Sequence, residues 1–103
     1  MNLKEKNLVD LGFVNRLTDL PGELPITNRE KEILIQMAQG KTNREISQKL
    51  ILSTSTVRNH ISSIFAKLRI SNRSQATAIA IYSGLLNPKT ENSENTQDEI
   101  KSA

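Results

Sequence analysis

The chain has no cysteine and no tryptophan, a single histidine, and three aromatic residues in all. Without cysteine it can form no disulfide, no thiolate metal site and no thiol switch. One histidine offers too few ligands for a typical metal cage. The scarcity of aromatic rings argues against a platform on which single-stranded nucleic acid stacks. Any hydrophobic core must therefore be built from aliphatic side chains.

Long apolar runs and catalytic motifs are also missing from the 103 residues. No stretch approaches the roughly 18 apolar residues of a membrane span, and the N-terminus lacks the apolar region of a signal peptide. We therefore expect no membrane association and a cytoplasmic location. There is no glycine-rich phosphate loop and no specific set of nucleophile, histidine and acid. The sequence predicts neither an enzyme nor a bound cofactor or metal.

Acidic residues are absent between Glu45 and Glu91. Residues 24–86 contain nine Lys and Arg residues against three acids, although the whole chain has a net charge of only +3. A positive potential concentrated in one region is typical of a protein that binds a polyanion. A basic surface that only keeps a small protein in solution is the alternative, and charge by itself does not decide between them.

Composition divides the chain into three parts. Residues 1–23 have an irregular helical spacing of apolar residues, which allows an additional N-terminal helix, and they end at Pro21-Gly22. Residues 24–86 form the predicted compact domain. Residues 87–103 are polar, with Ile100 as their only large apolar residue, and are predicted to be a disordered tail.

Four helices are predicted inside residues 24–86, at about 28–39, 43–50, 55–68 and 73–83. The first two begin with the capping-box pattern, in which a threonine and a glutamate three residues later satisfy free N–H groups at a helix start. The patterns are Thr27-x-x-Glu30 and Thr42-x-x-Glu45. A short helix, a tight turn at Ile51-Leu52 and a longer helix together follow the helix-turn-helix plan.

The predicted helix at 55–68 has two different faces. One face is apolar and consists of Val57, Ile61, Ile64, Phe65 and Leu68 at core-facing spacing. The other is polar and basic, with Arg58, Asn59 and Ser62. Such a helix can be held by a small domain while its polar face enters the major groove of DNA.

These residues resemble the LuxR-type DNA-binding domain, which is found in NarL/FixJ response regulators and in small regulators similar to GerE. The resemblance extends without a gap over about 60 residues. It rests on Thr27-Asn28-Arg29-Glu30-Lys31-Glu32-Ile33-Leu34, Gly40-Lys41-Thr42-Asn43-Arg44-Glu45-Ile46-Ser47, Leu50, Ser53, Thr56-Val57-Arg58-Asn59-His60, Ile64, Lys67-Leu68 and Asn72-Arg73-Ser74-Gln75-Ala76. It implies an all-α, four-helix domain that binds double-stranded DNA and regulates transcription, with the third of the four helices in the major groove.

The resemblance and the residue chemistry together give a set of candidate site residues. Arg58 is at the family's main base-contacting position and can bind guanine through two hydrogen bonds, while Asn59 can pair with adenine. Ser62 departs from the Lys or Arg common in the family, so its base contact is expected to be weaker or mediated by water. Hydroxyls, amides and helix N-termini supply phosphate contacts, and the candidates are Thr42, Asn43, Ser53, Ser55, Thr56, His60 and Lys67.

Several of these residues have a second interpretation. Thr42 and Ser53 can serve only as helix caps, and Arg58 can be a phosphate contact or a solvated surface arginine. Lys41, Arg44, Arg69 and Arg73 can attract DNA or be solvated charge, and Arg73 is also a candidate ion-pair partner of Glu30 or Glu45. A role for His60 in catalysis or pH sensing is disfavoured, because no cysteine or second histidine accompanies it.

The predicted helix at 73–83 is apolar nearly all round, so one side must cover the core and the other is available for a symmetric helix contact. The resemblance implies a homodimer through this helix, with Ala76, Ile79, Ala80 and Tyr82 at the interface. Folding of the N-terminal segment over this helix is the alternative. RNA polymerase is a further candidate partner. The competing functions are a protein-interaction module and the promoter-reading helix-turn-helix region of a sigma factor.

Overall fold

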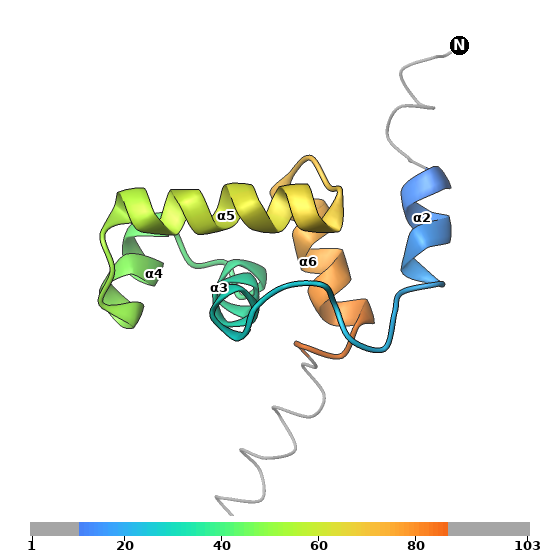
Figure 1. Cartoon of the computed structure of the whole chain (residues 1–103), viewed down its shortest axis with the longest axis horizontal. Coiled ribbons are helices and arrows are strands. Elements are labelled where there is room, and N and C mark those ends of the chain that lie inside the picture. The colour runs from blue at the N-terminus through green and yellow to red at the C-terminus, as the bar shows by residue number, and fades with distance from the viewer. Residues whose placement is uncertain (1–10, 87–103) are drawn as a thin grey trace, which may run out of the picture.

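The computed structural model describes residues 11–86 of the chain, and these form helices joined by loops (Figure 1). The described residues contain five helices and no strand. In chain order they are α2 (Leu11–Leu17), α3 (Asn28–Ala38), α4 (Asn43–Leu50), α5 (Thr54–Leu68) and α6 (Arg73–Tyr82). The predicted all-α fold is confirmed, and α2 supplies a helix within the N-terminal segment. The predicted tail at 87–103 lies outside the described residues.

Local hydrogen bonds explain why the helices begin where they do. The Thr27 hydroxyl accepts a hydrogen bond from the Glu30 N–H at 3.1 Å, while the Glu30 carboxylate accepts one from the Thr27 N–H at 2.8 Å. Thr42 and Glu45 make the same reciprocal pair at the start of α4, with the same two distances. Each such cap stabilises its helix by about 1 kcal/mol. The two capping boxes read from the sequence are thus present.

A single aliphatic core holds the helices together. α3 packs against α5 and α6, and α4 packs against α5. The completely buried aliphatic side chains from these four helices are Ile33, Leu34, Ile46, Val57, Ile64, Ala76 and Ala80. Because α3 lies in the middle of the domain, it fixes the position of α5 relative to the other helices (Figure 1).

The turn between α4 and α5 contains an unusual backbone conformation. Ile51 has φ 57° and ψ 53°, in the left-handed region, and its side chain is 88% exposed. β-branched residues adopt this conformation only at a cost, since the Cβ atom crowds the backbone. In return the chain reverses within a few residues, and the Leu52 N–H donates to the Ser47 carbonyl at 2.8 Å. The turn therefore sets the angle at which α5 leaves α4.

The predicted interface residues of α6 need a correction. Ala76, Ile79 and Ala80 lie in the core of the single chain, with Ile79 only 2% exposed, so none of the three is available to a partner. Tyr82 is 64% exposed, and Ile81 beside it is also exposed. A helix that is apolar nearly all round does not reveal from its sequence which side faces inward. Here Ala76, Ile79 and Ala80 face inward, whereas Ile81 and Tyr82 face outward.

Arg73 does not form the candidate ion pair with Glu30 or Glu45. Its Nη1 atom instead donates to the carbonyl oxygens of Met37 and Lys41, each at 3.0 Å. These carbonyls lie at and just beyond the end of α3, where the helix dipole favours a cation. Arg73 therefore ties the start of α6 to the end of α3.

Candidate DNA-reading surface

The polar face of α5 is a continuous exposed row. Ser55, Arg58, Asn59 and Ser62 are all exposed, whereas Val57, Ile64 and Leu68 on the opposite side are buried. Residues three, four and seven positions apart lie along one side of a helix, so these four side chains are neighbours. The Arg58 Nη2 atom donates to the Ser55 hydroxyl at 3.4 Å, a long hydrogen bond that leaves most of the guanidinium available.

The Ser53 hydroxyl caps the start of α5. The Ser53 hydroxyl accepts from the Thr56 N–H at 3.0 Å and donates to the Thr56 hydroxyl at 2.9 Å. A capped helix start still presents its first N–H groups and the positive end of the helix dipole, which together favour an anion. The same applies to α4, where Thr42 is the exposed cap and Asn43 is the first helical residue. His60 is half-buried, one turn further along α5.

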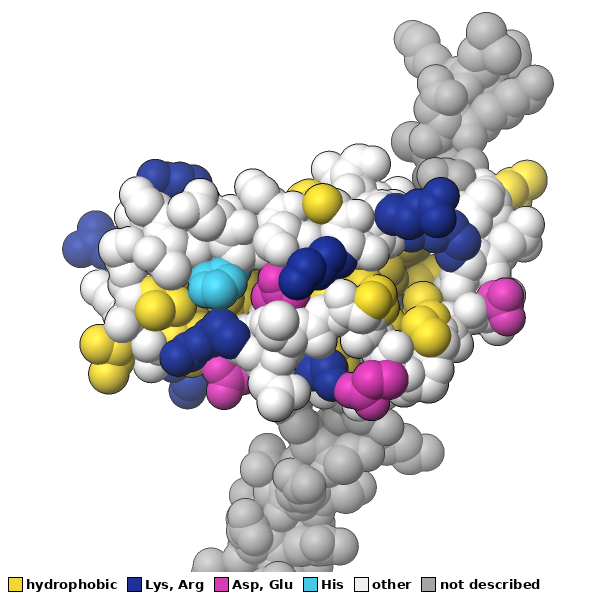
Figure 2. Space-filling view, viewed as in Figure 1, with side chains coloured by type: hydrophobic (Ala, Val, Ile, Leu, Met, Phe, Trp, Pro, Cys, Tyr) yellow, Lys and Arg dark blue, Asp and Glu magenta, His cyan; other side chains and the backbone are white. Residues whose placement is uncertain are grey.

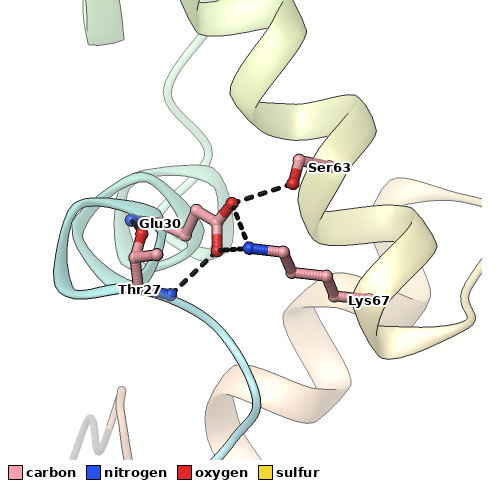
Figure 3. A network of polar contacts seen from close by, with 4 residues as sticks. All are labelled: Thr27, Glu30, Ser63 and Lys67. Atoms are coloured by element: carbon pink, nitrogen blue, oxygen red, sulfur yellow. Dashed lines mark hydrogen bonds and ion pairs between the residues drawn. The ribbon is translucent and has the colours of Figure 1, made fainter.

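Lys67 differs from the other predicted phosphate contacts because its charge is already engaged. Its ammonium lies 3.0 Å and 3.1 Å from the two carboxylate oxygens of Glu30, and the Ser63 hydroxyl donates to the same carboxylate at 2.9 Å. Figure 3 shows these three side chains and Thr27 converging between α3 and α5. The Lys67 side chain is 41% exposed, so its outer part still faces solvent.

Glu30 is only 4% exposed, and its carboxyl group is ionised in this position. Burial by itself would raise its pKa, but hydrogen bonds from the Thr27 N–H, Lys67 and Ser63, together with the Lys67 charge, outweigh burial and lower the pKa to about 2. The sequence identified Glu30 only as part of a capping box. No local pattern linked it to Ser63 and Lys67, which lie 33 and 37 residues further along the chain.

Basic side chains outnumber acids around the helix-turn-helix, where Glu45 in the first turn of α4 is the single acid of α4 and α5. Arg44, Lys49 and Arg58 are exposed on α4 and α5, and residues 46–86 contain no acid. Figure 2 shows several Lys and Arg side chains and the histidine on one face of the domain, with some Asp and Glu side chains among them. A surface with this charge and with donor groups in a row can bind an anionic backbone without any catalytic chemistry. Within the described range, no three His, Asp or Glu side chains are grouped to hold a metal.

α4, the Ile51 turn and α5 form a helix-turn-helix: a short helix, a tight reversal and a longer helix with an exposed polar face. Residues 24–80 match the family described as bacterial regulatory proteins, luxR family. Because the match extends over more than half of the chain, the chain belongs to this family.

Individual relatives agree with that assignment. The chain is 46% identical over 68 residues to the transcriptional regulatory protein LiaR of Bacillus subtilis (strain 168), a match that covers 66% of this chain and 32% of LiaR. It is 39% identical over 80 residues to the transcriptional regulatory protein LnrK of the same organism, covering 78% of this chain and 34% of LnrK.

A shorter relative is the spore germination protein GerE, also of Bacillus subtilis (strain 168). It is 43% identical over 61 residues, which are 59% of this chain and 82% of GerE. For LiaR and LnrK, by contrast, the chain spans about a third of the relative's length. None of the helices within residues 11–86 is long and apolar enough to cross a membrane.

Proposed function

We propose that this chain is a sequence-specific transcription regulator that binds double-stranded DNA as a dimer, with α5 in the major groove. The observation that carries the proposal is the exposed row on α5, in a chain that belongs to the luxR family. Relatives named transcriptional regulatory proteins support the same function.

Arg58, Asn59 and Ser62 are the proposed base-reading residues. All three are exposed on the same side of α5, within about two and a half turns of the capped helix start. Arg58 has most of its N–H donors available for the O6 and N7 atoms of a guanine, and the Asn59 amide can pair with adenine. Ser62 has a short side chain, so its contact is proposed to pass through water.

Phosphate contacts are proposed on both sides of this row. Thr42 and Asn43 lie at the start of α4, and Ser53, Ser55 and Thr56 lie at the start of α5. His60 and Lys67 would extend the contacts along α5. Lys67 has three N–H donors, and its two contacts with Glu30 leave one for a phosphate. We therefore assign Lys67 a smaller share of the electrostatic attraction than a lysine without an ion-pair partner would have.

The dimer contact is proposed on the outer side of α6. Ile81 and Tyr82 are the large apolar side chains exposed there, and Tyr82 is the member of the sequence-derived set that remains accessible. A twofold contact between two copies would bury both side chains and place two α5 helices for two half-sites.

Selection of binding sites from a pool of random duplex DNA tests this function directly. The purified chain at near-physiological salt is expected to enrich a motif with two half-sites, whose spacing reports the geometry of the dimer. Enrichment of no motif, with retention that disappears as salt is raised, would indicate only nonspecific electrostatic binding. A single half-site would support DNA reading but contradict the dimer.

A further inference from the structure

A cavity of about 360 Å³ lies between α2, the loop that follows it, the end of α5, and α6. Small-molecule sites in proteins begin at about this size. The α5 residues that line the cavity are Lys67 and Leu68, at the end of the helix. The cavity is therefore remote from the proposed base-reading residues Arg58, Asn59 and Ser62. It therefore has no part in the proposed contact with DNA bases.

The walls of this cavity are mainly aliphatic. They include Leu17, Leu20, Leu24, Leu68 and Ile79, with Phe13 of α2 as the aromatic member. Figure 2 shows hydrophobic side chains gathered in a hollow beside α2, next to Lys and Arg side chains. An apolar hollow with few polar partners holds water poorly, so an apolar ligand would gain free energy by displacing it.

One cation on the rim is held in a fixed position. Arg16 donates a hydrogen bond to the Leu68 carbonyl at the end of α5, and its guanidinium lies 5.8 Å from the centre of the Phe13 ring. The hydrogen bond to Leu68 uses one of the five N–H donors of Arg16, so the planar guanidinium can still bind a carboxylate through two hydrogen bonds. The second cation, Lys67, already balances Glu30. Asp19 is the acid among the lining residues.

We propose that this cavity binds a compact apolar carboxylate, with the acid group at Arg16 and the apolar part against the leucines. Its volume equals that of roughly 12 liquid water molecules, which suits an acid with a similar number of non-hydrogen atoms. Because α2, α5 and α6 all line the cavity, such a ligand joins the N-terminal helix to the end of the reading helix. The site is separate from the proposed base contacts, and it shares only Lys67 with the proposed phosphate contacts.

Calorimetric titration of the full chain with decanoate, decanol and decyltrimethylammonium, each below its micelle-forming concentration, tests the proposal. In the calorimeter, decanoate is expected to saturate one site. In a parallel NMR titration, decanoate is expected to shift the backbone amide signals of Leu17, Leu20, Leu68 and Ile79. Equal binding of all three probes would overturn recognition of the acid. Shifts confined to Ile81 and Tyr82 would overturn the location, and absence of saturable binding would overturn the site itself.

Two variants examine the polar rim, and a third serves as the control. Arg16→Gln is expected to weaken decanoate binding by about tenfold or more, because a hydrogen bond to a charged group is lost. Asp19→Asn should strengthen decanoate binding, because it removes a negative charge that repels the decanoate carboxylate while the hydrogen bonds of Arg16 remain. Arg29→Gln, on the exposed side of α3, should leave binding unchanged. Unchanged binding in both Arg16→Gln and Asp19→Asn would refute the assignment even if one variant proved unstable.

Discussion

Replacement of Glu30 by glutamine should reveal how strongly the buried carboxylate ties α3 to α5. The pKa of Glu30 falls from 4.5 to about 2 in the folded chain, and a lowering of this size corresponds to roughly 3 kcal/mol. Because the Lys67 side chain is 41% exposed, water screens part of this interaction. We therefore expect Glu30→Gln to lower the free energy of unfolding by about 2 kcal/mol at neutral pH.

The pH dependence gives a sharper test than the magnitude. A carboxyl group with a lowered folded-state pKa contributes its full stability above the unfolded-state value of 4.5 and loses it as the pH falls toward about 2. Urea denaturation of wild type and Glu30→Gln between pH 7 and pH 2 should therefore show a difference that is constant above about pH 5. The difference should then shrink as the pH approaches 2.

Glu32→Gln is the matched control, because Glu32 is two residues away and pairs with Arg29 at 3.2 Å on an exposed surface. Such a pair contributes about 0 to 1 kcal/mol. Equal effects of Glu30→Gln and Glu32→Gln would refute the assigned role of the buried network. So would a Glu30→Gln difference that does not change with pH.

Two further predictions concern backbone strain and the two sides of α6. Ile51→Gly should raise the free energy of unfolding by about 0.5–1 kcal/mol in urea denaturation, because glycine tolerates the left-handed conformation and the exposed Ile51 side chain packs little. A lower free energy of unfolding would contradict the idea that the Ile51 backbone is strained. Ile79→Ala should lower it by about 2–4 kcal/mol because Ile79 is buried. Tyr82→Ser should change monomer stability little but weaken self-association, as measured by sedimentation with and without a duplex. The reverse pattern would contradict the inward and outward sides described for α6.

Local sequence signals predicted the helices well. The capping boxes at Thr27 and Thr42 depend on contacts three residues apart, so the sequence alone contains all of their information. The apolar stripe of α5 was equally predictable, because helical spacing separates Val57, Ile64 and Leu68 from the polar row. The helical fold class and the exposed polar row of α5 therefore follow from patterns among residues only three or four positions apart.

Features that depend on contacts between helices were not predictable in this way. The network of Glu30, Ser63 and Lys67 joins residues more than 30 positions apart, and each has an ordinary surface role when read alone. Ala76, Ile79 and Ala80 were assigned to a dimer interface but lie in the core, because α6 is apolar nearly all round and its sequence does not show which side faces inward. The Arg16 contact with the end of α5 likewise depends on where α2 lies.

The ratio of specific to random DNA affinity in Arg58→Ala tests the central proposal most directly. Fluorescence anisotropy would compare a selected duplex with a scrambled one at several salt concentrations, with Arg29→Ala as the control on α3. The account predicts that Arg58→Ala lowers this ratio, reducing the difference in binding free energy between the two duplexes by about 1–3 kcal/mol because a base contact is lost. Arg29→Ala should leave the ratio unchanged. Equal losses of affinity for both duplexes in Arg58→Ala would contradict a base-reading role for α5.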